Sequence, residues 1–137
     1  MASENQWAYD IESLVYSVVK AKKESNLKTK YPNIKFTQDE ESDSTAKFPT
    51  VLIQSMEPIE KNSDLEKKKI YTVRFTTQVT VTSNAKRIDA LRVAQELAQQ
   101  YKDLLFDISP LPFVRKSGKI WTAIFRASRT FDWNDKL

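Results

Sequence analysis

The chain has 137 residues, of which 40% are hydrophobic and 29% charged, as expected for one folded domain with a modest core. It contains no histidine, no cysteine and a single glycine, Gly118. These absences exclude a Ser-His-Asp triad, a thiolate metal site and a glycine-rich phosphate loop. We therefore expect a protein that is not an enzyme and needs no cofactor or metal. No apolar run approaches the roughly 20 residues that cross a bilayer, so no membrane association is expected.

The net charge of +4 is distributed unevenly along the chain. Residues 39–66 carry eight acids against two lysines, so this part is acidic and the remainder is strongly basic. Such segregation is typical of a solvated surface, and less often of one half of a complementary contact. The eight acids are Asp39, Glu40, Glu41, Asp43, Glu57, Glu60, Asp64 and Glu66.

Apolar residues recur at three- and four-residue spacing from about Glu4 to Glu24, which is typical of an amphipathic helix. A helix of this kind packs one face on a core and exposes the other. The predicted buried face consists of Trp7, Ile11, Leu14, Val15, Val18 and Val19.

Two short strands are predicted next, one around residues 34–37 and one in "FPTVLIQSME". The segments "DEESDSTAK" and "PIEKNSDLEKK" are polar and have no periodicity, so both are expected to be loops.

The most regular pattern lies in "KKKIYTVRFTTQVTVTSNAKRIDALRVAQEL". Apolar and polar residues alternate from Ile70 to Thr82, which predicts a long strand with one buried face. A helix follows, with Ser83 or Asn84 as the expected N-cap. Its predicted apolar stripe consists of Ile88, Leu91, Ala94, Leu97, Ala98, Tyr101, Leu104 and Leu105.

The prolines of "ISPLPFV" end this helix, and two strands joined by a hairpin at Ser117-Gly118 follow. Arg129 falls on the apolar side of the last strand, which indicates the rim of the sheet or, less favoured, an interface. The other residues on that side are Trp121, Ala123, Phe125, Ala127, Phe131 and Trp133.

The predicted order is therefore helix, strand, strand, long strand, helix, strand, strand (α-β-β-β-α-β-β). This order favours an α+β fold with a mostly antiparallel sheet of four or five strands and two helices packed on one face. No linker divides the chain, so residues 1–137 are expected to form a single domain.

This order resembles that of the tail terminator, or tail completion, proteins of long-tailed bacteriophages. The segments that carry the resemblance are "WAYDIESLVYSVVKA", "FPTVLIQSM", "IYTVRFTTQVTVTS", "AKRIDALRVAQELAQQYKDLL" and "WTAIFRASRTF", which cover most of the chain. It is a likeness of order, spacing and texture, without a catalytic signature. Related neck and head-tail joining proteins share the fold, so a neck or connector component is an alternative.

The resemblance implies a structural virion protein, made in the host cytoplasm, that forms a ring, usually a hexamer, at the head-proximal end of the tail. The ring would cap the tail tube, stop its polymerisation and provide the surface for head joining. The implied partners are further copies of the chain, the tail tube protein and a head-completion or connector protein. DNA would pass through the ring without specific recognition.

A closed ring of identical subunits needs two different surfaces that fit each other. Unlike charges favour such pairing and disfavour like-to-like contact. The acids of residues 39–66 are candidates for one surface, with solvated loops as the alternative. The candidates for the other surface are Arg115, Lys116, Lys119, Arg126 and Arg129.

A small basic nucleic-acid-binding module is the main alternative, supported by the pI of about 9.2 and the lysines between Lys20 and Lys35. Against it, the aromatic residues alternate on the predicted core face instead of lying among the cations. An enzyme that uses carboxylates, such as a glycosidase, lacks an obvious acid pair in the strands.

Overall fold

The computed structural model describes residues 5–32, 34–38, 49–56, 58–63, 69–84 and 86–135. Within these ranges no helix is long and apolar enough to cross a membrane. The elements are α1 (Gln6–Tyr9), α2 (Ile11–Lys30), β1 (Lys35–Thr37), β2 (Thr50–Ser55), β3 (Ile59–Ser63), β4 (Ile70–Ser83), α3 (Arg87–Asp103), β5 (Asp107–Ile108), β6 (Phe113–Ser117) and β7 (Ile120–Asp132).

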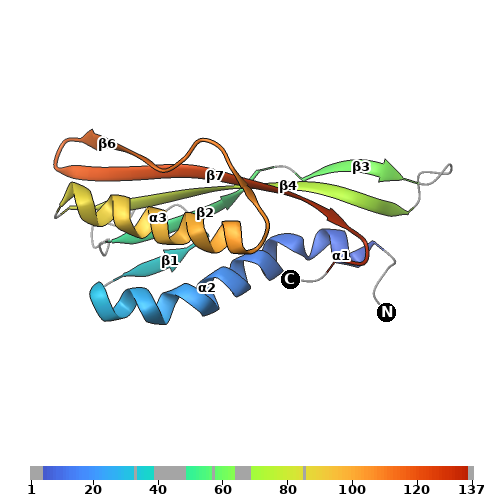
Figure 1. Ribbon diagram of the computed structural model, residues 1–137, viewed down its shortest axis with the longest axis horizontal. Helices are drawn as coiled ribbons and strands as arrows, with labels where there is room; N and C mark the ends of the chain where they lie inside the picture. Colours follow the sequence, from blue (N-terminus) through green and yellow to red (C-terminus); the bar gives the residue numbers. More distant parts are fainter. Residues whose placement is uncertain are drawn as a thin grey trace.

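The fold is α+β, with one mixed sheet in the order β1-β2-β4-β7-β5. β3 extends the β2 side by pairing with β4, and β6 extends the β5 side by pairing with β7. β4 and β7 form the antiparallel centre, in register from Thr72 opposite Asp132 to Ser83 opposite Trp121. Helices α2 and α3 lie on the same side of this sheet (Figure 1). We call that side the helix side and the other the open face.

The α+β class is confirmed, but the sheet has seven strands among the described residues instead of the predicted four or five. The described pairings are antiparallel except that β1 runs parallel to β2, with Phe36 opposite Val51. A parallel connection needs about a dozen residues, which the chain between Thr37 and Thr50 supplies.

β3 lies in a segment that was predicted to be a loop, and that prediction was wrong. It pairs with β4 through Ile59 opposite Arg74, with register shifts between Glu60 and Ser63. An edge strand of this kind needs ladder hydrogen bonds on one side only, and Ile59 is itself exposed. The periodicity of the side chains therefore carries no signal for this strand.

The first predicted helix is divided at Asp10 into α1 and α2, and α2 continues beyond the predicted end to Lys30. Leu27 is fully buried and anchors the added turns, and Pro32 follows the last turn. The amide of Ile70 donates to Asn5 Oδ1 at 2.8 Å and fixes the start of α1 against β4.

Helix α3 begins at Arg87 without a side-chain N-cap, and Ser83 is a buried residue of β4. The predicted cap was therefore wrong. Two residues of the predicted stripe, Ile88 and Leu105, are exposed. The buried face of α3 instead includes Ala90 and Val93, which were not part of the predicted stripe and are completely buried.

Aromatic rings fill the space between α3 and the helix side of the sheet. Tyr101 stands edge-on to Phe106, with ring centroids 5.1 Å apart, and to Phe125 at 6.0 Å. Phe106 also makes edge contacts with Phe75 at 6.4 Å and Phe131 at 5.9 Å. Each edge-to-face pair adds about 0.5–1.5 kcal/mol to the stabilisation from burial alone. These rings fix α3 over the central strands.

The C-terminus of α3 ends in a Schellman motif. The amide of Phe106 donates to the Tyr101 carbonyl at 3.0 Å, and the amide of Leu105 donates to the Lys102 carbonyl at 2.9 Å. Leu105 takes a φ of 69°, a conformation that favours glycine, and its side chain is 74% exposed.

Candidate functional site

The hairpin between β6 and β7 forms one end of the elongated molecule (Figure 1). Ser117 pairs with Ile120, so the turn residues are Gly118 and Lys119, one position later than predicted. Gly118 has a φ of 61°, and Leu105 is the only non-glycine residue in the described ranges with a positive φ. A positive φ at the first turn residue alone is the pattern of a type II′ turn, which fits the twist of a hairpin.

This hairpin carries three of the predicted basic residues, Arg115, Lys116 and Lys119, and all three are exposed. The guanidinium of Arg115 lies 5.1 Å from the ring of Phe113. The ammonium of Lys116 lies 4.9 Å from the ring of Trp121. Cation–π contacts hold both charges close to the strands. We call residues 113–121 the basic hairpin.

The other two predicted basic residues lie elsewhere, on opposite faces of β7. Arg126 is exposed on the open face, where its Nε donates to Gln78 Oε1 at 3.0 Å. Arg129 points to the helix side, and its side chain is only 12% exposed. The five candidates therefore do not form one continuous surface.

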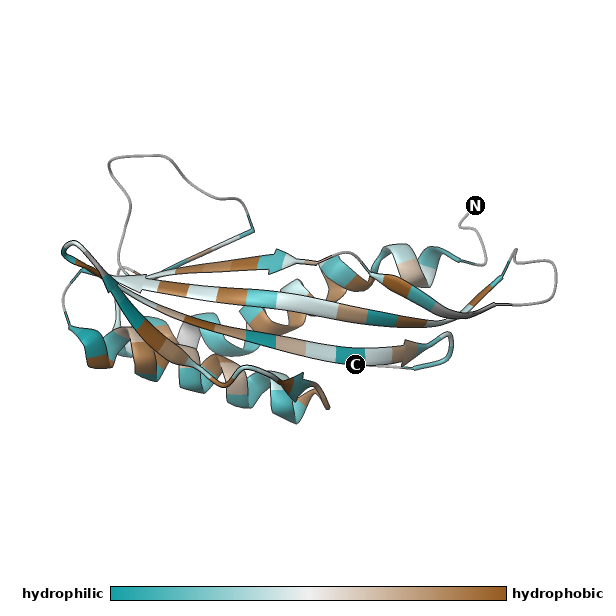
Figure 2. Ribbon diagram, turned by 90° about the horizontal axis from the view of Figure 1, so that it is seen from above, coloured by the Kyte–Doolittle hydropathy of each residue, from teal (hydrophilic) through white to brown (hydrophobic). Residues whose placement is uncertain are grey.

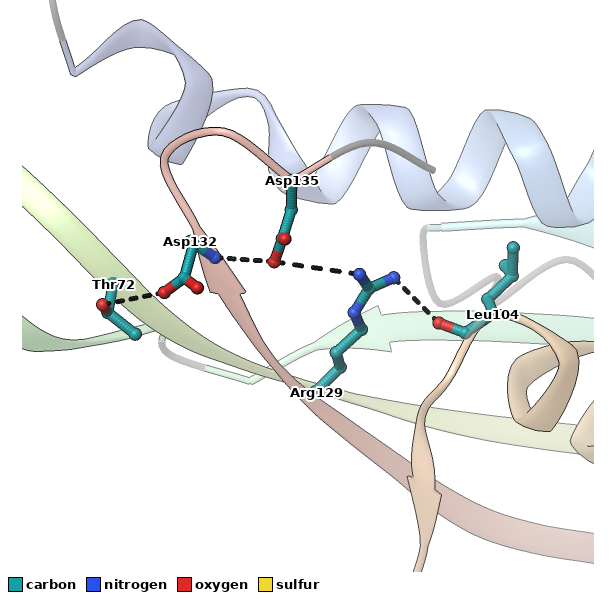
Figure 3. A network of polar contacts seen from close by, with 5 residues as sticks. All are labelled: Thr72, Leu104, Arg129, Asp132 and Asp135. Atoms are coloured by element: carbon teal, nitrogen blue, oxygen red, sulfur yellow. Dashed lines mark hydrogen bonds and ion pairs between the residues drawn. The ribbon is translucent and has the colours of Figure 1, made fainter.

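Arg129 is occupied within the subunit (Figure 3). One guanidinium nitrogen donates to the carbonyl of Leu104 at 2.8 Å, at the C-cap of α3. Another lies 3.8 Å from Asp135 Oδ2, and the guanidinium lies 4.4 Å from the centre of the Phe131 ring. A cation at this position donates to a carbonyl that has no partner within the helix, and it is stabilised by the negative end of the helix dipole. Arg129 thus links α3 to the end of β7.

The same network fixes the turn that follows β7. The amide of Asp132 donates to Asp135 Oδ2 at 2.8 Å, and Thr72 Oγ1 donates to Asp132 Oδ1 at 3.1 Å (Figure 3). The amide of Trp133 donates to the carbonyl of Tyr71 at 2.9 Å. The turn is therefore held by both β4 and α3.

A groove of about 450 Å³ lies between this turn and the first helices. Its floor is apolar, and two of its lining side chains, Leu14 and Trp133, are each 52% exposed. Among the residues that the structure describes, three aspartates line it and no lysine or arginine does. The lining residues, which we call the carboxylate groove, are Trp7, Asp10, Ile11, Leu14, Val18, Phe131, Asp132, Trp133 and Asp135.

Sequence reasoning assigned Trp7, Leu14 and Trp133 to buried faces and so missed this groove. Trp7 lies in α1 and is partly buried against the core, Leu14 is exposed on α2, and Trp133 is exposed just after the end of β7. The one sequence signal for this region was Arg129, because a charged residue in the apolar pattern of β7 marks where the regular core-facing pattern stops.

The open face is polar, and its side chains pair across the central strands. Thr76 and Ser128 hydroxyls are 3.0 Å apart, and Arg74 donates to Thr130 at 3.3 Å. Apolar and polar residues alternate along the ribbons of β4 and β7 (Figure 2). The polar half of that alternation makes up this face.

Of the predicted acidic candidates, the structure places Glu60, which is exposed on β3. β3 pairs with the part of β4 that lies opposite residues 130–132 of β7, far from the basic hairpin. The remaining candidates lie outside the described residues: Asp39, Glu40, Glu41, Asp43, Glu57, Asp64 and Glu66.

In the part of the chain that the structure describes, no three acidic residues are grouped as they would be to hold a metal ion. Comparison of the sequence with protein-family models gave no match, and comparison with curated proteins gave none either.

Proposed function

We propose that the protein is a structural subunit of a bacteriophage tail, of the tail terminator type. Copies would form a ring, hexameric as in the proteins that the sequence resembles, at the head-proximal end of the tail tube. The ring would stop tube polymerisation and present the surface that joins the head. The protein would act without catalysis or a cofactor.

The observation that carries this proposal is the unlike character of the two ends of one rigid subunit. The basic hairpin lies at one end of the central strands, and the carboxylate groove lies at the other. A ring of identical subunits needs two different complementary surfaces of this kind. The resemblance in the order of elements supports the same class.

Electron microscopy of the native particle, with the protein carrying a visible tag, tests the proposal. We expect label in a single ring at the head-proximal end of the tail tube. Label along the tube, at the distal end or nowhere on the particle would overturn the assignment.

A nucleic-acid-binding module is the second candidate, favoured by the open face. The outward positions of the central strands and β6 carry Arg74, Arg115 and Arg126, with Asp132 at one end. Titration with DNA at two salt concentrations separates the candidates. A binding module gives tight binding with a steep salt slope, and a passage lined by this face gives weak binding at both concentrations.

A further inference from the structure

We propose that the basic hairpin of one copy docks into the carboxylate groove of a second copy. This inference rests on the proposed function in one respect, because the contact would be the subunit interface of the ring. It names the surfaces that meet, and these surfaces differ from the acidic segment that the sequence suggested.

The geometry requires two copies. Both sites belong to β7, which begins at Ile120 in the hairpin and reaches Phe131 and Asp132 in the groove. A strand of this length spans about 40 Å at roughly 3.3 Å per residue. The hairpin therefore cannot fold back into its own groove. Contacts of this head-to-tail type close into a ring or continue as a filament, according to the rotation between copies.

The charges of the two sites are complementary. The hairpin presents Arg115, Lys116 and Lys119 without a carboxylate among the described side chains of β6 or its turn. The groove presents the carboxylates of three aspartates. Each already has a hydrogen-bond partner among the described residues: Gln6 at 2.9 Å from Asp10, Thr72 at 3.1 Å from Asp132, and the amide of Asp132 at 2.8 Å from Asp135.

Of the described residues, Arg129 and Lys69 border the groove without lining it. Arg129 approaches Asp135 at 3.8 Å, and the ammonium of Lys69 lies 4.7 Å from the centre of the Trp133 ring. A carboxylate can accept about four hydrogen bonds, so Asp10 and Asp132 keep free acceptor positions for an incoming cation. These two carboxylates are the expected partners of the hairpin.

The apolar surfaces also correspond. Ile120 is 36% exposed beside the turn, and Phe113 and Trp121 are partly buried under the cations. The groove offers Leu14 and Trp133, and its volume lies within the range of about 300–1,000 Å³ in which pockets hold compact groups. An apolar centre with charged groups around it is the usual arrangement of a specific interface.

Disulfide trapping tests the contact directly, because the natural chain has no cysteine. The variant with Ile120→Cys and Leu14→Cys should form reducible dimers and longer chains under mild oxidation. The matched control combines Ile120→Cys with Ser13→Cys, since Ser13 is an exposed neighbour on the same helix but does not line the groove. We expect loss of the cross-linked species in the control. Equal cross-linking in both pairs, or none in either, would overturn the docking.

Complementation then tests the head-to-tail direction. One variant reverses the hairpin with Arg115→Glu and Lys119→Glu, and the other reverses the groove with Asp10→Lys and Leu14→Lys. Each variant alone should lose self-association in native mass spectrometry at low salt. An equimolar mixture retains one intact interface, between the natural hairpin of one variant and the natural groove of the other, and should therefore form at least dimers. Mixtures that stay monomeric while both variants remain folded by circular dichroism would contradict the proposal.

The two proposals can fail separately. A labelled ring at the tube end without the Ile120–Leu14 cross-link would remove this docking mode and leave the proposed function. A specific cross-link in a protein that is absent from the virion would leave the docking and remove the function.

Discussion

The two faces of the central strands carry alternate residues of the same sequence and differ in almost every physical respect. On the helix side, Phe75, Val79, Val81 and Phe125 are at most 1% exposed. On the open face, the residues beside them are mostly threonine, serine, glutamine and arginine, bonded mainly to one another, with Ile124 as an exception. The helix side is packed against a specific set of side chains, whereas the open face is in contact with solvent.

This difference separates the residues that determine the fold from those that are free for contact. Substitutions on the helix side disturb packing against α3, whereas substitutions on the open face and at its ends leave the core intact. The basic hairpin and the carboxylate groove both lie at the ends of the strands, beyond the tightly packed centre. Surface for assembly can therefore vary without unfolding the subunit.

The largest expected effect is from Phe125→Ala on the helix side. Its ring is completely buried against Tyr101, so the free energy of unfolding should fall by about 3–5 kcal/mol. Thr80→Ala on the open face is the matched control and should change it by under about 0.5 kcal/mol. Urea denaturation measures both. Similar losses in the two variants would mean that the two faces do not differ as described.

The two arginines of β7 give the next comparison. Arg129→Ala leaves the carbonyl of Leu104 without its donor and should lower the free energy of unfolding by about 1–3 kcal/mol. Arg126→Ala, on the open face, should lower it by under about 1 kcal/mol, because exposed pairs contribute little. Thermal and urea unfolding of both variants should give this order, and the reverse order would remove the capping role of Arg129.

Leu105 belongs to neither face and should respond in the opposite direction. Leu105→Gly relieves a left-handed backbone conformation of a residue with a Cβ atom, and we expect a gain of up to about 1 kcal/mol. Leu105→Ala retains the Cβ and removes the exposed side chain, so it should give no gain. If the free energy of unfolding rises equally in both variants, relief of backbone strain at residue 105 is not the cause of the rise.

The smallest effect at neutral pH is expected for Tyr101→Phe. Thr77 Oγ1 donates to the Gln54 carbonyl at 3.1 Å, and the nearby Tyr101 hydroxyl has no partner with hydrogen-bond geometry among the described residues. Removing that hydroxyl should therefore change the free energy of unfolding by under about 1 kcal/mol.

The difference should appear in alkali. Burial raises the pKa of Tyr101 far above its ordinary value, so its neutral form is favoured in the folded state. The wild type then loses stability as the pH rises above about 10, where the unfolded tyrosine ionises. The phenylalanine variant lacks this loss. Above that pH, its free energy of unfolding in urea titrations should therefore rise relative to that of the wild type. Parallel pH profiles would contradict the assignment.

Much of the fold follows from local pattern in the sequence. The alternation from Ile70 to Thr82 and in β7 identified both central strands and their buried faces. Gly118 identified the hairpin to within one residue, because a tight turn has few alternatives. Helix α3 was also predicted, since its apolar spacing is regular over most of its length.

The remainder depends on contacts that the sequence does not encode locally. β3 is polar and held by backbone pairing, and the parallel course of β1 is set by how the chain returns to β2. The groove forms because the fold brings α1 and α2 beside the turn after β7, so that Trp7 and Trp133, distant in sequence, line the same space. Arg129 interrupts a pattern, but only the fold places Leu104 within reach of it.

The central claim is that this subunit terminates a tail tube, and the length of tubes made without it tests that claim most directly. Particles produced after deletion of the gene should contain tail tubes longer than normal that are not joined to heads, measured in electron micrographs. The wild-type protein supplied in trans should restore normal length. Tubes of normal length joined to heads in the deletion would contradict the account.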